Sequence, residues 1–101
     1  MILARVTGTV VSTVKEPRLE GIKFLLLEHI DVNTLKGKNE FTVAMDAVGA
    51  GEGELVFFVG GSSSRQTEIT SGMPSDATVI AIVDSFDIAG KTVYSKGGVE
   101  K

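Results

Sequence analysis

The chain has 101 residues, of which 43% are hydrophobic and 23% are charged, and it contains no cysteine. This length corresponds to one domain, and the composition is that of a folded globular protein rather than a disordered chain. The lack of cysteine excludes disulfides and thiolate metal sites, and a formal net charge of −3 without a run of lysine or arginine argues against a nucleic-acid surface.

The first half of the chain predicts three strands separated by polar turns. Hydrophobic and polar residues alternate along residues 2–14, a period-two pattern that would place Val6, Gly8 and Val10 on one buried face. A second strand region covers residues 19–32, and its stretch 24–27 is apolar on both faces. We therefore expect that strand to be covered on two sides, by its own core and by a helix or another subunit.

A polar loop is predicted over residues 33–39, and alternation along residues 40–47 predicts the third strand. Three glycines then fall within residues 49–53, where tight turns favour this residue. Residues 55–59 are almost continuously apolar, which predicts a strand too hydrophobic for one face to meet water. The serines that begin segment 62–67 are suited to capping one short helix.

The last quarter of the chain predicts one more buried strand and a closing hairpin. Residues 78–83 are apolar and β-branched, which is typical of a strand with little exposure to water. Residues 84–87 predict a turn or bulge. Residues 88–94 predict a hairpin that turns at Gly90.

Together these elements predict an all-β fold, a small OB-like barrel of five to six strands with a short helix. We expect one domain over residues 1–94 and a flexible C-terminal tail over residues 95–101. The segment from Met1 to Arg5 lacks the basic region of a secretory signal, and the longest apolar run is far too short to cross a bilayer. We therefore expect no membrane partner.

Two polar segments are candidates for a functional surface. The first segment, residues 49–54, lacks the Gly-Lys-Ser/Thr sequence of a phosphate loop and precedes a predicted strand rather than a helix. Its glycines therefore suit left-handed backbone at two or three positions, or the close approach of adjacent subunits. The second segment, residues 60–65, offers backbone amides, hydroxyl groups and a guanidinium group, which suit an anion site, a pore lining or only a helix cap. The candidates are Gly49, Ala50, Gly51, Glu52, Gly53 and Glu54 in the first segment, and Gly60, Gly61, Ser62, Ser63, Ser64 and Arg65 in the second.

Catalysis is the function that the residues support least. The single histidine, His29, has no cysteine or second histidine with which to build a metal site, and we expect it to be a satisfied or solvent-facing residue of a strand. The carboxylate pairs Asp84/Asp87 and Glu52/Glu54 suit turns and a solvated surface better than glycosidase chemistry. We therefore expect no enzymatic activity, no cofactor and no metal.

An OB-type barrel also suits the binding of single-stranded nucleic acid or another ligand, and the fold alone leaves this alternative open. Such sites combine a basic groove with stacking aromatic side chains. The chain has one tyrosine, no tryptophan and five phenylalanines, and it is acidic. This composition argues against nucleic acid as a partner.

In their order and spacing, several segments resemble the EutN/CcmL family. The strongest similarity lies in the glycine-rich segment and in the serine-rich segment that follows it, and the resemblance extends over about residues 1–94. The matching segments are residues 1–13, Leu25-Leu26-Leu27 with the polar turn after it, residues 46–56, residues 60–65, residues 76–84 and Gly90-Lys91.

The resemblance implies a shell subunit that forms homopentamers at the five-fold vertices of a bacterial microcompartment, in the cytoplasm. The partners it implies are further copies of the chain and hexameric shell proteins, whose flat layers cannot close into a polyhedron without rings of five. It also favours a subunit-interface or pore role for both polar segments. Ser63 and Ser64, where many relatives carry alanine, depart from the family pattern. The residues themselves are compatible with a ring but do not indicate five copies rather than three or six.

Overall fold

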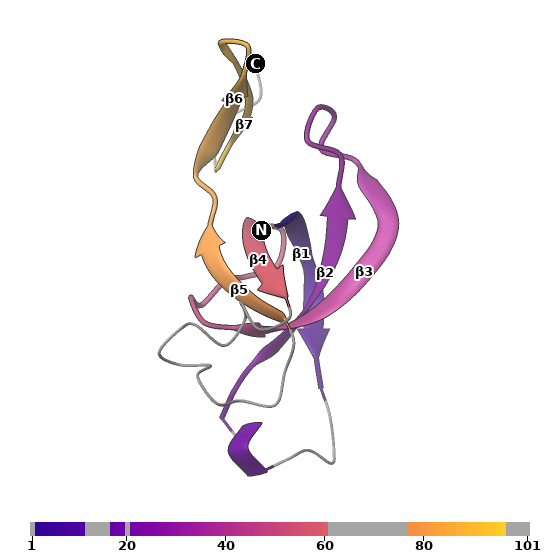
Figure 1. The fold of residues 1–101 in the computed structure, drawn as a ribbon, viewed down its shortest axis with the longest axis vertical. Helices are drawn as coiled ribbons and strands as arrows, with labels where there is room; N and C mark the ends of the chain where they lie inside the picture. Colours follow the sequence, from indigo (N-terminus) through magenta and orange to yellow (C-terminus); the bar gives the residue numbers. More distant parts are fainter. Residues whose placement is uncertain (1, 12–16, 20, 61–76, 97–101) are drawn as a thin grey trace.

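The computed structural model describes residues 2–11, 17–19, 21–60 and 77–96, and these residues form an all-β fold (Figure 1). In chain order the elements are β1 (Ile2–Val10), the 3₁₀ helix η1 (Pro17–Leu19), β2 (Phe24–Ile30), β3 (Gly37–Asp46), β4 (Leu55–Gly60), β5 (Ala77–Ile82), β6 (Ser85–Ile88) and β7 (Lys91–Ser95). Ser95, the first residue of the predicted tail, is the last residue of β7.

Five of the strands close into a barrel in the order β1-β2-β3-β5-β4, in which β4 returns to pair with β1. Neighbouring strands are antiparallel except β3 and β5, which run parallel. A closed barrel leaves none of these strands with a free edge. The predicted all-β barrel is confirmed.

The barrel interior is filled by one face of each strand, as the alternating pattern predicts. Directly paired residues point to the same side of a sheet, so the pairs Val6–Leu27 and Ala44–Leu25 place their side chains together inside. The core residues are Ala4, Val6, Leu25, Leu27, Ala44, Ala50, Val56, Phe58, Ala77 and Val79.

A bulge in β1 overturns one detail of the expected pattern. The register of β1 on β2 shifts between Val6 and Gly8, so that Val6 pairs with Leu27 whereas Gly8 pairs with Leu26. Because Leu26 and Leu27 point to opposite faces, Gly8 and Val10 lie on the outer face and do not share the inner face with Val6. The predicted common face is therefore wrong beyond the bulge.

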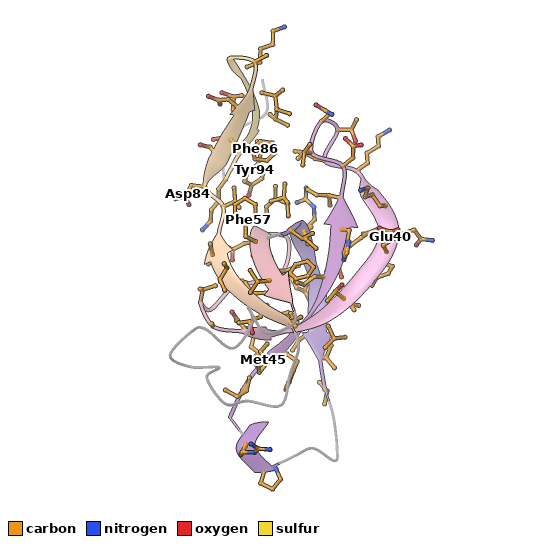
Figure 2. The ribbon with its side chains drawn as sticks, viewed as in Figure 1. Glu40, Met45, Phe57, Asp84, Phe86 and Tyr94 are labelled. Atoms are coloured by element: carbon orange, nitrogen blue, oxygen red, sulfur yellow. The ribbon has the colours of Figure 1, made fainter. Side chains whose placement is uncertain are left out.

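A second hydrophobic cluster lies outside the barrel, under the C-terminal hairpin. Leu3 pairs with Phe57 on the outer face of β1 and β4, and Phe86 and Tyr94 of the hairpin pack in the same cluster. The side chains of Phe57, Phe86 and Tyr94 lie together where the hairpin leaves the barrel (Figure 2). A two-stranded hairpin is marginally stable alone, so this burial is what holds β6 and β7 in place. The cluster comprises Ile30, Leu55 and Val83, with Leu3, Leu35, Phe57, Phe86 and Tyr94 packed against them.

The hairpin itself was predicted in part. Its turn at Ala89 and Gly90 is confirmed, and the positive φ angles of these residues, 51° and 83°, are those of a two-residue turn that matches strand twist. Of the turn or bulge expected over residues 84–87, the bulge is confirmed, because the register of β6 on β7 shifts between Phe86 and Asp87, whereas a turn is not found, because Ser85–Ile88 forms β6. The half-buried Phe86 and Ile88 alternate there with exposed Ser85 and Asp87, a pattern of four residues that is short enough to be mistaken for a loop.

Other element boundaries differ by a few residues from those predicted. β3 begins at Gly37, inside the polar loop expected over residues 33–39. The strand expected over residues 2–14 ends at Val10, and residues 12–14 lie outside the described part of the chain. The helix expected at segment 62–67 also lies outside it, and the helical segment that the structure does describe is η1.

Candidate subunit interface

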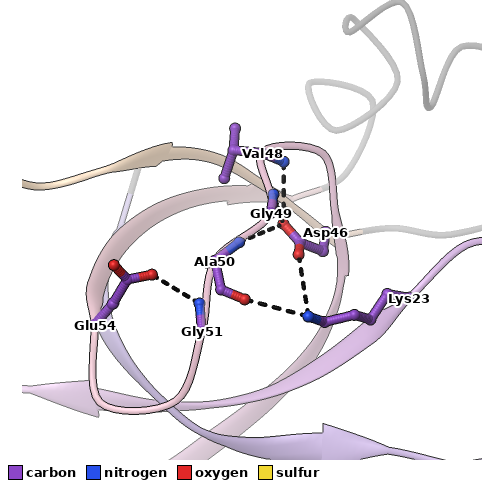
Figure 3. A network of polar contacts seen from close by, with 7 residues as sticks. All are labelled: Lys23, Asp46, Val48, Gly49, Ala50, Gly51 and Glu54. Carbon is purple, nitrogen blue, oxygen red and sulfur yellow. Dashed lines mark hydrogen bonds and ion pairs between the residues drawn. The ribbon is translucent and has the colours of Figure 1, made fainter.

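The glycine-rich loop between β3 and β4 is folded around one carboxylate. Asp46, the last residue of β3, accepts hydrogen bonds at Oδ1 from the backbone amides of Val48, Gly49 and Ala50, at 3.0, 2.9 and 3.3 Å (Figure 3). The Asp46 side chain is only 3% exposed. Amides that converge in this way form an anion site. The chain's own carboxylate occupies this one, so these three amides are not available to a phosphate.

Lys23, just before β2, ties this turn to the barrel. Its Nζ lies 4.0 Å from Oδ2 of Asp46 and donates a hydrogen bond to the carbonyl oxygen of Ala50 at 3.4 Å (Figure 3). The side chain of Ala50 is fully buried in the barrel core. The first half of the loop is therefore fixed by polar contacts on one side and by the core on the other.

Glu54 closes the second half of the loop. Its Oε1 accepts a hydrogen bond from the amide of Gly51 at 2.7 Å, and its Oε2 lies 2.9 Å from Nζ of Lys96. The Gly51 amide, followed by the Lys96 ammonium, lowers the pKa of the Glu54 carboxyl because both stabilise its ionised form. The same ion pair raises the pKa of Lys96. Lys96 follows β7, so this pair connects the loop to the C-terminal hairpin.

Gly53 joins the end of the loop to β1. Its amide donates to the carbonyl oxygen of Val6 at 2.8 Å, and its carbonyl oxygen accepts from Nη1 of Arg5 at 2.9 Å. The φ angles of Gly49 and Gly53 are 79° and 89°, in the left-handed region where a side chain is strained. The expectation of left-handed backbone at two or three positions of this loop is confirmed.

The loop presents mostly backbone to its surroundings. Gly49, Gly51, Glu52 and Gly53 are exposed, and Glu52 is the one long side chain among them. A stiff, nearly bare backbone permits another chain to approach closely. Its role at a subunit interface remains a prediction.

The second candidate segment is described only at its first residue. Gly60 ends β4, pairs with Ala77 of β5 and is exposed. Gly61, Ser62, Ser63, Ser64 and Arg65 lie outside the described residues, so the interface or pore role expected for them stays a prediction.

His29 is half-buried on β2, where it pairs with Ala4 of β1. Its Nε2 lies 2.8 Å from Oγ1 of Thr42, its ring contacts Phe58 at a centroid distance of 5.5 Å, and its Nδ1 lies 3.8 Å from a carboxylate oxygen of Glu40. This setting agrees with the structural role that the sequence favours. Over the described ranges, no three histidine, aspartate or glutamate side chains are grouped to hold a metal. No helix in that same part of the chain is long and apolar enough to cross a membrane.

The two strands that are apolar on both faces differ in what covers them. For β4, the outward Leu55 is fully buried, and the half-buried Phe57 packs in the same cluster as Phe86 and Tyr94 of the chain's own C-terminal hairpin. For β2, Leu26 is only half-buried, and its partner Val43 on β3 is 47% exposed. Sequence reasoning missed Val43 and the 50% exposed Phe41, whose alternation on β3 predicted a strand but not which face met water.

Comparison with known proteins places this barrel among shell proteins. Residues 1–84 match the family described as ethanolamine utilisation protein EutN/carboxysome. The chain is 44% identical over 96 residues to the carboxysome shell vertex protein CcmL of Synechococcus elongatus, covering 95% of this chain and 96% of that protein.

Solved structures agree with the sequence comparison. CcmL of Gloeobacter violaceus superposes with a TM-score of 0.90 at 44% identity, covering 97% of this chain and all of that one. The pentameric microcompartment shell protein GrpN of Rhodospirillum rubrum superposes with a TM-score of 0.74 at 39% identity, covering 87% of this chain and 98% of that one.

Proposed function

The chain belongs to the EutN/CcmL family, and we propose that it is a structural shell subunit whose pentamers cap the five-fold vertices of a bacterial microcompartment in the cytoplasm. The observation that carries this proposal is similarity over nearly the whole chain, in sequence and in fold, to proteins that are named for a shell vertex and for a pentamer. A vertex subunit needs self-association and shape rather than chemistry, so we propose that the chain has no catalytic activity.

The proposed partners are further copies of the chain and hexameric shell proteins. Six-fold units tile a flat layer, and a closed polyhedron requires five-fold units at its corners. A ring of identical subunits forms through heterologous contacts, in which one surface of each copy meets a different surface of the next. We propose the glycine-rich loop, Gly49 to Glu54, and the segment Gly60 to Arg65 as surfaces that meet a neighbour or line the opening at the ring axis.

The physical support for the loop is its rigidity. It is held by Asp46, Lys23 and Glu54 within its own subunit, so docking would not require the ordering of a flexible segment. Binding by a pre-ordered surface avoids the entropic cost of immobilising a loop at the interface.

A co-assembly experiment tests the vertex role. A hexameric shell protein of the same organism is produced with and without this chain, and the assemblies are imaged by electron microscopy. The proposal predicts closed polyhedra only when the chain is present and open sheets or tubes when it is omitted. Closed polyhedra of unchanged size and number in its absence would contradict the role.

The OB-type nucleic-acid alternative is not carried forward. A single-stranded nucleic acid requires a basic groove beside stacking aromatic side chains. On the outer face of β2 and β3, Phe41 lies beside the aliphatic Leu26 and Val43 and directly opposite the acidic Glu28. An aliphatic setting in which the neighbouring Glu28 pairs with Arg5 is not the basic groove that a phosphate backbone requires.

A further inference from the structure

A hydrophobic strip runs across the outer face of β1, β2 and β3. We define the exterior strip as Val10, Leu26, Phe41 and Val43. The register places them on one face, because Leu26 pairs directly with Val43, and Val10 and Phe41 each lie two residues along from the residues paired with Leu26. Phe41 is 50% exposed and Val43 is 47% exposed, whereas Val10 and Leu26 are half-buried.

Gly8 gives the same face a second unusual feature. It pairs with Leu26, its φ is not in the left-handed region, and a Cβ built on it would meet no heavy atom within 4 Å. Neither backbone conformation nor crowding within the described chain therefore requires glycine at this position. A glycine inside a strand costs stability, and it commonly marks a bulge, such as the one that precedes Gly8, or a place where another backbone approaches closely.

Intramolecular packing distinguishes this face from the other apolar outer wall. On β4 and β1, the outward Phe57 and Leu3 are half-buried in the cluster that also holds Phe86 and Tyr94 of the C-terminal hairpin. The strip on β2 and β3 retains large exposed apolar side chains. Clustered exposed apolar side chains on a folded subunit mark an association surface.

We propose that the exterior strip and Gly8 form one of the two unlike surfaces through which adjacent copies of this chain pack in the ring. This inference rests on the proposed function for the self-association itself. We take the partner that covers the exterior strip to be a second copy of the chain, because a related protein is itself described as a pentameric shell protein. Permanent contacts between identical subunits have an apolar centre and a polar rim. Arg5 and Glu28, which pair directly beside the strip, supply charges for such a rim.

The first test replaces Val43 with aspartate and measures assembly by analytical ultracentrifugation over a range of concentrations. A charge buried in an apolar contact raises the concentration at half-assembly by at least about 100-fold. The matched control is Val32→Asp, in the turn after β2, because Val32 is 46% exposed and the change in charge is the same. We expect the Val32 variant to form rings as the unmodified chain does.

A second variant removes any ambiguity from misfolding. Gly8→Val adds a β-branched side chain in open space on a strand, so the subunit should fold at least as well as the unmodified chain. The added side chain nevertheless occupies the surface proposed to meet the neighbour. We expect a folded chain by circular dichroism with assembly weakened at least about tenfold, because packed interfaces do not accept extra methyl groups.

The outcomes separate the two proposals. Rings that withstand both Val43→Asp and Gly8→Val overturn the strip and leave the vertex role intact, whereas failure of the unmodified chain to associate overturns the vertex role. The chain has no cysteine, so Val43→Cys and Val32→Cys each introduce a single thiol. In isolated rings, slower maleimide labelling of the Val43→Cys variant than of the Val32→Cys variant supports the proposal. Protection of that thiol only after a hexameric shell protein is added would assign the strip to that protein and overturn the proposal.

Discussion

Replacing Asp46 with alanine should loosen the glycine-rich loop more than any other single polar change in it. Asp46 Oδ1 accepts three backbone amides, and Nζ of Lys23 lies near its other oxygen. A hydrogen bond to a charged group contributes about 1.5–3 kcal/mol, and a buried donor left unpaired forfeits that amount. The amides of the exposed Val48 and Gly49 can be hydrated instead, whereas Ala50 is fully buried.

On this reasoning one of the three hydrogen bonds, that of the Ala50 amide, is lost without replacement, and Asp46→Ala lowers the free energy of unfolding by roughly 1.5–3 kcal/mol. Asp46→Asn keeps an oxygen in the same place without its charge. It should cost about half as much, because hydrogen bonds to neutral acceptors are weaker.

Urea denaturation at one fixed protein concentration measures this loss, since ring formation would make the stability depend on concentration. The natural control is Glu52→Ala, which truncates an exposed side chain in the same loop. If the free energy of unfolding of the Asp46→Ala variant lies within about 0.5 kcal/mol of that of the unmodified chain, this carboxylate does not hold the loop and the reasoning fails.

Three further perturbations test the contacts around the loop and the hairpin. Gly53→Ala should destabilise the fold by roughly 1–2 kcal/mol in urea denaturation, because Gly53 has a φ of 89°. Glu54→Gln should lower stability at neutral pH, and the difference in stability from the unmodified chain should shrink on acidification. The reason is that the pKa of Glu54 is lower in the folded state than its unfolded-state value near 4.5. The stability that the ionised Glu54 carboxylate contributes is therefore complete above the unfolded-state pKa and is lost as the pH falls through the folded-state pKa. Tyr94→Ala should uncover Phe57 and cost about 1–3 kcal/mol in thermal unfolding, because the half-buried ring covers the outer cluster.

Each of these perturbations has a matched control. Gly51→Ala lies in the same loop without a positive φ, and its Cβ would meet only Glu54 Oε1 at 3.8 Å, so a loss equal to that of Gly53→Ala would refute the backbone argument. Glu52→Gln removes the charge of an exposed carboxylate in the same loop and should leave the stability at neutral pH unchanged. Thr92→Ala on exposed β7 should leave thermal stability unchanged, and an equal loss there would mean that truncation anywhere in the hairpin has the same effect as uncovering Phe57.

The strands were predictable where the pattern was strong and uninterrupted. The apolar run 55–59 became β4 and the β-branched run 78–83 became β5, each within one residue of the prediction. The bulge after Val6 was not predictable, because an extra residue in a strand leaves the alternation of the sequence intact while it reverses the faces beyond it. β6 was missed because only two apolar residues mark it.

The backbone of the glycine-rich loop was predictable, whereas its side-chain contacts were not. Gly49 and Gly53 predicted left-handed backbone. Asp46 is followed three residues later by a glycine, which is a recognisable turn signal. The pairing of Glu54 with Lys96 has no such signal, since it depends on where the hairpin folds back. For the same reason, the sequence could not tell that β4 is covered by its own chain whereas the exterior strip is not.

Native mass spectrometry of the purified chain at micromolar concentration tests the central claim most directly. A vertex subunit should give a single assembly of five copies of the 10.6-kDa chain, with no substantial monomer. A stable single copy, or a closed ring with a number of subunits other than five, would contradict the account.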